Sequence, residues 1–257
     1  MTLARLEGQA SPLYIYAISL MAAVGGFLFG YDLQIISGAV LYLRNEFHLN
    51  ATQEAVALGS ATAGCLLGPL LGIWLADSRL GRKWSLMLAA ALFLISALGT
   101  AFPRNFLHFN VYRLIGGAGV GLASVVSPMY IAEISPARIR GRLVSLNQFA
   151  IVFGAFLASL AALYFSKNFS PDVSWRWMFG SECLPILFLM TGLLFIPRSP
   201  RWLVHKNRIE EATGVLTKIN GRPQAQTEIR AIEESLAGDP GTWRELFQPG
   251  LRIALLV

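Results

Sequence analysis

The chain has 257 residues, of which 54% are hydrophobic and 14% are charged, and its formal net charge is +6. Soluble domains carry about 25% charged residues, so the composition excludes an ordinary soluble protein and indicates an integral membrane protein. A positive charge is also typical of nucleic-acid-binding proteins, but here the basic residues fall in short clusters between apolar runs. Orientation in a lipid bilayer explains that distribution better, and we expect no nucleic-acid partner.

Six apolar runs are long enough to cross about 30 Å of hydrocarbon at about 1.5 Å per helical residue. They cover residues 13–43, 55–76, 84–102, 106–131, 143–165 and 177–196. The sequence therefore predicts an all-α membrane protein with a six-helix transmembrane bundle over residues 1–196. Lysine and arginine are denser in the connections after the second and fourth runs than after the third and fifth. By the positive-inside rule, both termini are expected to be cytoplasmic in an inner or plasma membrane.

The character of the chain changes after residue 196. Polar residues dominate, and apolar residues recur at helical spacing, so residues 197–245 are predicted to form a cytoplasmic helical domain. Residues 246–257 begin another apolar run that is too short to span a bilayer. We interpret this last stretch as the truncated start of a seventh transmembrane helix, in a chain that is a fragment.

Two opposite charges lie deep in the apolar runs. Arg113 belongs to an otherwise uncharged run, where a charge costs about 2.5 to 3.5 kcal/mol and needs a partner or a water-filled cavity. Asp32 lies about 16 Å from the outer end of the first helix, and Arg113 about 10 Å from the outer end of the fourth. We therefore predict that they pair. The pair is either a static link between two helices or a carboxylate whose protonation is tuned by its partner. Asp32 is taken to be the only acid deep in the runs.

The fourth run, residues 106–131, is expected to be an interior helix. Its small residues let neighbouring helix backbones approach closely in a membrane. They include Gly116, Gly117, Gly119 and Gly121.

One face of the fifth run begins with a polar side chain. Gln148 shares this face with Ile151, Val152 and Ala155, at offsets of three, four and seven residues. An amide offers two hydrogen-bond donors and an acceptor, which suits a neutral ligand rich in hydroxyl groups. The alternative is a bond to a neighbouring helix, which spacing alone favours. Asn147 is expected to be the structural member of the adjacent pair.

Two polar clusters lie in the connections on the predicted cytoplasmic side. One contains Arg79, Gly81, Arg82 and Lys83, and the other contains Glu133, Pro136, Arg138 and Arg140. The arginine and lysine residues there could merely set the orientation of the protein in the membrane and contact lipid phosphates. Glu133 is acidic where the orientation rule favours positive charge, so we favour a charge network that closes an inner gate.

The residue patterns that resemble enzyme signatures do not occur in the structural setting that those signatures require. His48, His108 and His205 are scattered without metal-ligand spacing. The glycines around Gly119 fall inside an apolar run with no preceding strand, which argues against dinucleotide binding. We expect no catalytic residue, metal or cofactor.

Several stretches, taken together and in order, resemble a known family. They are GGFLFGYDLQIISGAV, Arg79-x-Gly81-Arg82-Lys83, Arg113-x-x-Gly116-Gly117-x-Gly119-x-Gly121, Glu133-x-x-Pro136-x-x-x-Arg140-Gly141, LNQFAIVFG, WRWMFGSECLP and Pro197-x-Ser199-Pro200-Arg201-Trp202-Leu203. The chain resembles the N-terminal half of the sugar porters of the major facilitator superfamily, most closely the bacterial xylose-proton symporters. That resemblance implies a twelve-helix fold of two six-helix bundles, with a sugar site between them at mid-membrane. The partners implied are a sugar, a proton, the lipid bilayer and a C-terminal six-helix bundle that is missing here.

The resemblance also implies roles for individual residues. Phe29 and Gln148 would contact the sugar, on a substrate-binding face that continues through Ile151, Val152 and Ala155. Asp32 would carry the proton with Arg113 as its partner. The inner gate would be latched by Arg79, Gly81, Arg82, Lys83, Glu133, Arg140 and Arg201. The expected function is monosaccharide transport by alternating access, as sugar-proton symport. Facilitated sugar diffusion and membrane sugar sensing are the alternatives.

Three positions depart from the family pattern. Arg198 stands where an acid is usual, which changes the sign of one gate contact. Ser78 stands directly before Arg79 where an acid or amide is usual, with Asp77 displaced by one position. Ala155 stands where the xylose symporters carry a second glutamine, so xylose is not claimed as the substrate.

Overall fold

The computed structural model of the chain describes residues 12–237. The predicted start of a seventh transmembrane helix at residues 246–257 lies outside this range, as do the last residues of the predicted cytoplasmic domain. Within the described range the structure is all-α, without strands, and six segments are long and apolar enough to cross a membrane. The long helices are α1 (Pro12–Glu46), α2 (Ala51–Asp77), α3 (Gly81–Ala101), α4 (Phe106–Ile134) and α5 (Arg140–Asn168). The prediction of six transmembrane segments is therefore confirmed.

The sixth segment is not one continuous helix. It consists of α6 (Pro171–Gly180) and α7 (Cys183–Phe195), separated by Ser181 and Glu182. Pro185 explains the interruption, because proline has no N–H to donate to the carbonyl four residues earlier, and its ring clashes with that carbonyl. The carbonyl in question belongs to Ser181, and it accepts from the N–H of Leu184 at 3.3 Å instead.

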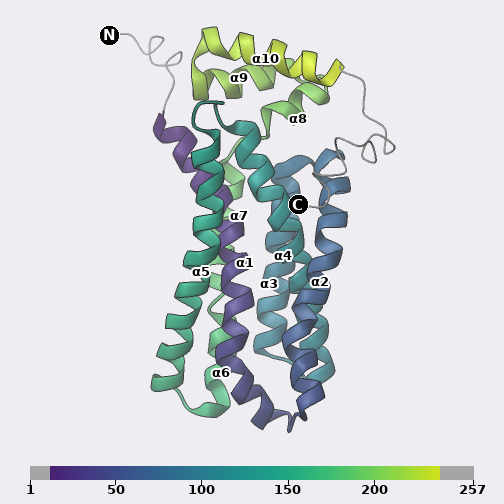
Figure 1. Cartoon of the computed structure of the whole chain (residues 1–257), viewed down its shortest axis with the longest axis vertical. Coiled ribbons are helices and arrows are strands. Elements are labelled where there is room, and N and C mark those ends of the chain that lie inside the picture. The colour runs from purple at the N-terminus through teal and green to yellow at the C-terminus, as the bar shows by residue number, and fades with distance from the viewer. Residues whose placement is uncertain (1–11, 238–257) are drawn as a thin grey trace, which may run out of the picture.

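The long helices run side by side in the bundle (Figure 1), and several of them meet through close backbone contacts. A Cβ atom on Gly64 of α2 would overlap the carbonyl oxygen of Leu114 on α4, and a Cβ on Gly117 of α4 would overlap that of Ala61 on α2. Small residues permit such close approaches. In a membrane the hydrophobic effect does not drive helices together, so their association depends on close packing of this kind. The helix α4 packs against α1, α2, α3 and α5, which confirms its predicted interior position.

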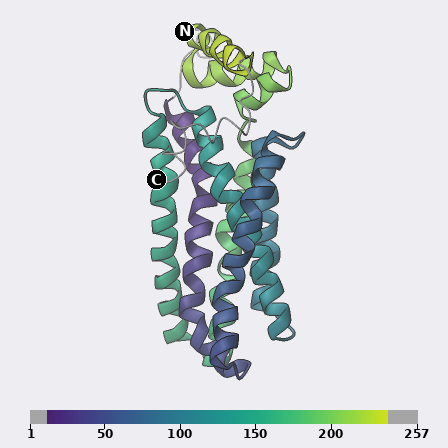
Figure 2. The ribbon, with the colours of Figure 1, turned by 45° about the vertical axis from the view of Figure 1, so that its right-hand side comes forward.

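Three shorter helices follow the bundle: α8 (Pro200–His205), α9 (Ile209–Asn220) and α10 (Arg222–Ala237). They lie across the end of the bundle where α1 and α5 begin, as Figures 1 and 2 show. Leu216 of α9 packs with Ala225 and Ile229 of α10 in a small apolar core. The layer α8–α10 therefore has packing of its own, and it caps the membrane-spanning part at one end.

Candidate functional site: a buried charge cluster and an end-face ion network

Asp32 of α1 and Arg113 of α4 form an ion pair inside the bundle. Arg113 Nη1 lies 2.5 Å from Asp32 Oδ1, and the two side chains are 1% (Asp32) and 0% (Arg113) exposed. The ring of Phe179 lies 5.7 Å from Arg113 Cζ. The pairing predicted from matching depths is confirmed.

Each partner of this pair keeps an unused polar atom. Asp32 Oδ2 and Arg113 Nε are buried and have no hydrogen-bond partner among the described residues. A buried polar atom without a partner costs about 1 to 3 kcal/mol.

Glu182 adds a second acid to this region. It lies at the break between α6 and α7, is 2% exposed, and its Oε1 has no hydrogen-bond partner within residues 12–237. The expectation that Asp32 is the only deep acid is therefore wrong. The signal was present in the sequence, because Glu182 falls inside the sixth apolar run, three residues before Pro185.

A hydrogen bond fixes the position of the helix break. The Tyr31 and Ser181 hydroxyl oxygens lie 2.7 Å apart, and each residue directly precedes one of the two buried acids. The bond joins α1 to the α6–α7 break. It brings the stretch of α1 that carries Asp32 next to the break that carries Glu182, so this region holds two buried carboxyl groups and one guanidinium.

The predicted face of α5 is open over part of its length. Gln148 and Val152 are exposed, whereas Ile151 and Ala155 are half-buried. Phe29 of α1 is half-buried and packs against the main apolar core.

Asn147 is buried, and its side-chain oxygen lies 2.9 Å from the Ser127 hydroxyl of α4. Its predicted structural role is confirmed.

A second charged group lies at the end of the bundle that carries α8–α10. Arg82 of α3 contacts Glu133 of α4, with Nη2 and Oε1 at 2.8 Å, and Asp77 of α2, with Nη1 and Oδ1 at 2.8 Å. The Ser199 hydroxyl donates to the other Glu133 oxygen. The network expected from the two polar clusters therefore exists. The displaced acid, Asp77, still reaches Arg82 although Ser78 holds the usual position.

Gly81 supports this network through its backbone. Its φ is +71°, a left-handed conformation that favours glycine. A Cβ atom there would lie 2.8 Å from Cε2 of Trp202, whose indole N–H donates to the Ser78 carbonyl at 2.9 Å. Gly81 thus lets α8 dock on the loop between α2 and α3.

Several residues assigned to the gate have other contacts. Lys83 Nζ donates to the carbonyls of Leu194 and Ile196 at 3.0 and 2.8 Å, where a positive charge suits the C-terminal end of α7. Arg140 donates to the Ser135 carbonyl at 3.3 Å. Arg79 and Arg201 are exposed.

Arg198, one of the three residues that depart from the family pattern, lies over the Trp202 ring, with Cζ 4.8 Å from the ring centroid. Arg198 therefore contacts an aromatic ring at a position where an acid is usual in the family. The acid that pairs with Arg82 next to α8 is Glu133 of α4.

We expect Arg82→Gln to lower the free energy of unfolding by about 3 kcal/mol, because it leaves Glu133, whose side chain is only 10% exposed, without its counter-charge. Arg79→Gln is the matched control, since Arg79 is exposed, and it should change stability by less than about 0.5 kcal/mol. Thermal unfolding of the purified variants measures both. Equal effects of the two substitutions would contradict a structural ion pair.

The fold and the site define a multi-pass membrane protein with a charged cluster buried between its helices. Residues 18–257 match the family model described as "Sugar (and other) transporter". The D-xylose-proton symporter of Escherichia coli (strain K12) is 40% identical over 98% of this chain and 57% of its own length. The arabinose-proton symporter of Bacillus subtilis (strain 168) is 36% identical over 95% of this chain and 53% of its own length.

A solved structure agrees with the sequence comparison. The partially occluded, inward-open xylose transporter from E. coli matches with a TM-score of 0.82 and 41% identity, over 87% of this chain and 59% of that one. The chain belongs to the sugar transporter family, within the major facilitator superfamily. It spans about half the length of the curated relatives given above.

Proposed function

We propose that this bundle forms part of a transporter that moves a monosaccharide together with a proton by alternating access. The observation that carries the proposal is the buried cluster of Asp32, Arg113 and Glu182, in which both carboxyls keep a free oxygen. A passive sugar carrier has no need of buried titratable groups, which are costly in a membrane and typical of proton pathways. The relatives whose printed names specify a proton support the same interpretation.

The cluster suggests how a proton is taken up and released. A carboxylate beside a guanidinium is stable as an anion, whereas an isolated buried carboxylate favours its protonated form. Arg113 contacts Asp32 here, and Glu182 offers it a second carboxyl. In our proposal, a movement that shifts Arg113 between the two acids leaves a proton on the one that it abandons.

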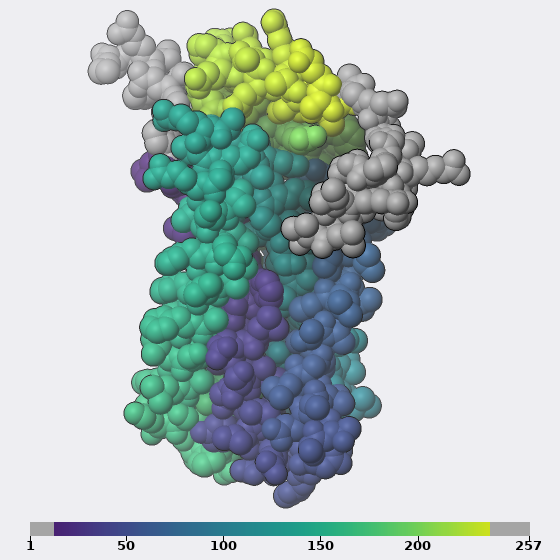
Figure 3. All heavy atoms as spheres, in the orientation of Figure 1, coloured from purple at the N-terminus to yellow at the C-terminus, as the bar shows by residue number. Residues whose placement is uncertain are grey.

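The sugar would bind on the open face of the bundle. Figure 3 shows α1 lying between α5 and α2 on this face. In our proposal a second six-helix bundle covers the face, and Gln148, exposed on α5, offers its amide to sugar hydroxyls together with Phe29. The exposure of Gln148 supports this role over a bond to a neighbouring helix. Ile151, Val152 and Ala155 would line the same wall.

The proposed orientation places the layer α8–α10 in the cytoplasm. The end of the bundle next to this layer carries the basic turns before α3 and α5, and positive charge favours the cytoplasmic side. At that end, Arg82, Glu133 and Asp77 would latch the inner gate while it is closed. Arg79, Arg140 and Arg201 would add contacts to the second bundle, whereas Lys83 binds the end of α7.

We expect Gln148→Ala, in a complete transporter that carries this bundle, to weaken sugar binding by about 1 to 3 kcal/mol, because a sugar hydroxyl loses its buried partner. Calorimetric titration with the transported sugar measures the change. Gln226→Ala, on the exposed side of α10, is the control and should leave the affinity unaltered. An unaltered affinity in Gln148→Ala would remove Gln148 from the sugar site.

A further inference from the structure

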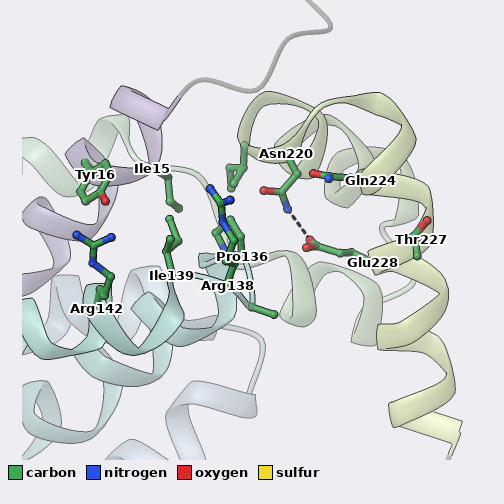
Figure 4. Close-up of a pocket in the computed structure, with 12 residues that line it drawn as sticks. Ile15, Tyr16, Pro136, Arg138, Ile139, Arg142, Asn220, Gln224, Thr227 and Glu228 are labelled. Atoms are coloured by element: carbon green, nitrogen blue, oxygen red, sulfur yellow. Dashed lines mark hydrogen bonds between the residues drawn. The ribbon is translucent and has the colours of Figure 1, made fainter.

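A cavity of about 730 Å³ lies between the membrane bundle and the layer α8–α10. One wall comes from the start of α1 and the turn between α4 and α5, and the other from the end of α9 and the start of α10 (Figure 4). Small-molecule sites occupy about 300 to 1,000 Å³, so the cavity has the size of a ligand site. Its lining includes neither the Asp32–Arg113 pair nor the Arg82–Glu133 pair.

The wall on the bundle side is basic. Arg138 and Arg142 come from the turn between α4 and α5 and from the first turn of α5. In Figure 4, Arg142 lies beside Tyr16 and Arg138 extends toward Asn220. Neither arginine is in a salt bridge within residues 12–237. A guanidinium presents paired N–H groups that match a phosphate, so this wall suits a phosphate group.

The facing wall is polar and mostly uncharged. Asn220, Gln224 and Thr227 contribute two amides and a hydroxyl, and amides and hydroxyls both donate and accept hydrogen bonds. Such groups suit the hydroxyls of a polyol. The residues Ile15, Ile139 and Ile219 supply apolar lining between the two polar regions.

One acid lines the cavity, and it is already engaged. Asn220 Nδ2 donates to Glu228 Oε2 at 2.7 Å. Burial raises the pKa of Glu228, while the Asn220 bond and the charge of Arg140 act in the opposite direction. The Glu228 carboxyl therefore offsets at most one of the two arginine charges, and the cavity stays favourable for an anion.

We propose that this cavity binds a phosphorylated polyol, with its phosphate at Arg138 and Arg142 and its hydroxyls at Asn220, Gln224 and Thr227. The same chemistry has two sources, the headgroup of a phosphatidylglycerol molecule in the adjacent leaflet and a soluble sugar phosphate. Either ligand bridges the turn between α4 and α5 to α10. The bound ligand therefore links the layer α8–α10 to the membrane bundle.

The test uses the purified 257-residue chain in phosphatidylcholine nanodiscs. One arm titrates glucose 6-phosphate by calorimetry, with glucose as the neutral counterpart. The other arm adds phosphatidylglycerol and measures retained lipid by native mass spectrometry, with phosphatidylcholine as the counterpart. The variant carrying Arg138→Gln and Arg142→Gln should lose at least about tenfold in affinity, the size expected for charged hydrogen bonds. Arg230→Gln removes an exposed charge of α10 outside the cavity lining and should bind like the unmodified chain.

The two arms distinguish the sources. Binding of glucose 6-phosphate alone identifies a soluble ligand, and selective retention of phosphatidylglycerol alone identifies a lipid. Gln224→Ala changes an exposed side chain of the other wall, so it tests the site even where the double variant does not fold, and it should weaken binding several-fold. The proposal is overturned when glucose 6-phosphate binds no better than glucose and phosphatidylglycerol is retained no better than zwitterionic phosphatidylcholine, or when Gln224→Ala binds like the unmodified chain. Equal losses in Arg230→Gln and the double variant overturn it as well.

Discussion

Replacing Asp32 with Asn, in a complete transporter that carries this bundle, is expected to abolish sugar uptake against a concentration gradient. Asparagine is similar in size and stays polar, but it cannot exchange a proton. Asp32 is buried and pairs with Arg113, so its loss removes a titratable group from the interior. Uptake driven by a pH gradient into liposomes should fall to the level of protein-free liposomes. Sugar counterflow, which needs only reorientation of the loaded carrier, should persist.

The two assays separate coupling from binding, and a matched variant controls for the chemical change itself. Asp172→Asn makes the same replacement at an exposed residue of α6 and should leave both assays intact. If Asp32→Asn still accumulates sugar with the original pH dependence, Asp32 is not the coupling residue. The ion pair with Arg113 is then a static link between α1 and α4.

Replacing Gly30 with Val is expected to prevent α1 and α5 from packing. A Cβ atom on Gly30 would overlap the carbonyl oxygen of Ile151, and a Cβ on Gly154 would overlap that of Phe27. Overpacking commonly costs about 1 to 3 kcal/mol, and here the obstacle is backbone that cannot rotate away. We therefore expect a loss of about 3 kcal/mol or more in the free energy of unfolding.

The control for this substitution is Gly59→Val in α2, where nothing lies within 4 Å of an added Cβ atom. Both variants place the same β-branched side chain on a membrane helix. Thermal unfolding followed by circular dichroism should show a large loss for Gly30→Val and little change for Gly59→Val. Similar melting curves for the two variants would show that the α1–α5 contact is not close-packed.

The sequence predicted those features that depend on depth and composition. The number of membrane segments follows from apolar run lengths, and the pairing of Asp32 with Arg113 follows from similar depths in helices that run in opposite directions. Both are seen in the structure. The interior position of α4 follows from its glycines, because only small residues allow the backbone approaches seen at Gly117.

The missed features depend on local geometry that a run of hydrophobic residues hides. Glu182 is hidden when the sixth run is taken as one uniform helix, because Pro185 interrupts that run beside the acid. Lys83 belongs to a cluster that predicts a gate, but its reach to the carbonyls at the end of α7 depends on how α3 packs against α7. Sequence spacing within one segment carries no information on such contacts between distant segments.

The most direct test of the proposed symport is the proton movement that accompanies sugar. Liposomes with a complete transporter that carries this bundle are held without a pH gradient, and sugar is added outside in weakly buffered medium. Our proposal predicts that the external pH rises as protons enter with the sugar, and that Asp32→Asn abolishes this rise. Sugar entry at the normal rate without any change of external pH would contradict the proposal and identify the protein as a facilitative carrier.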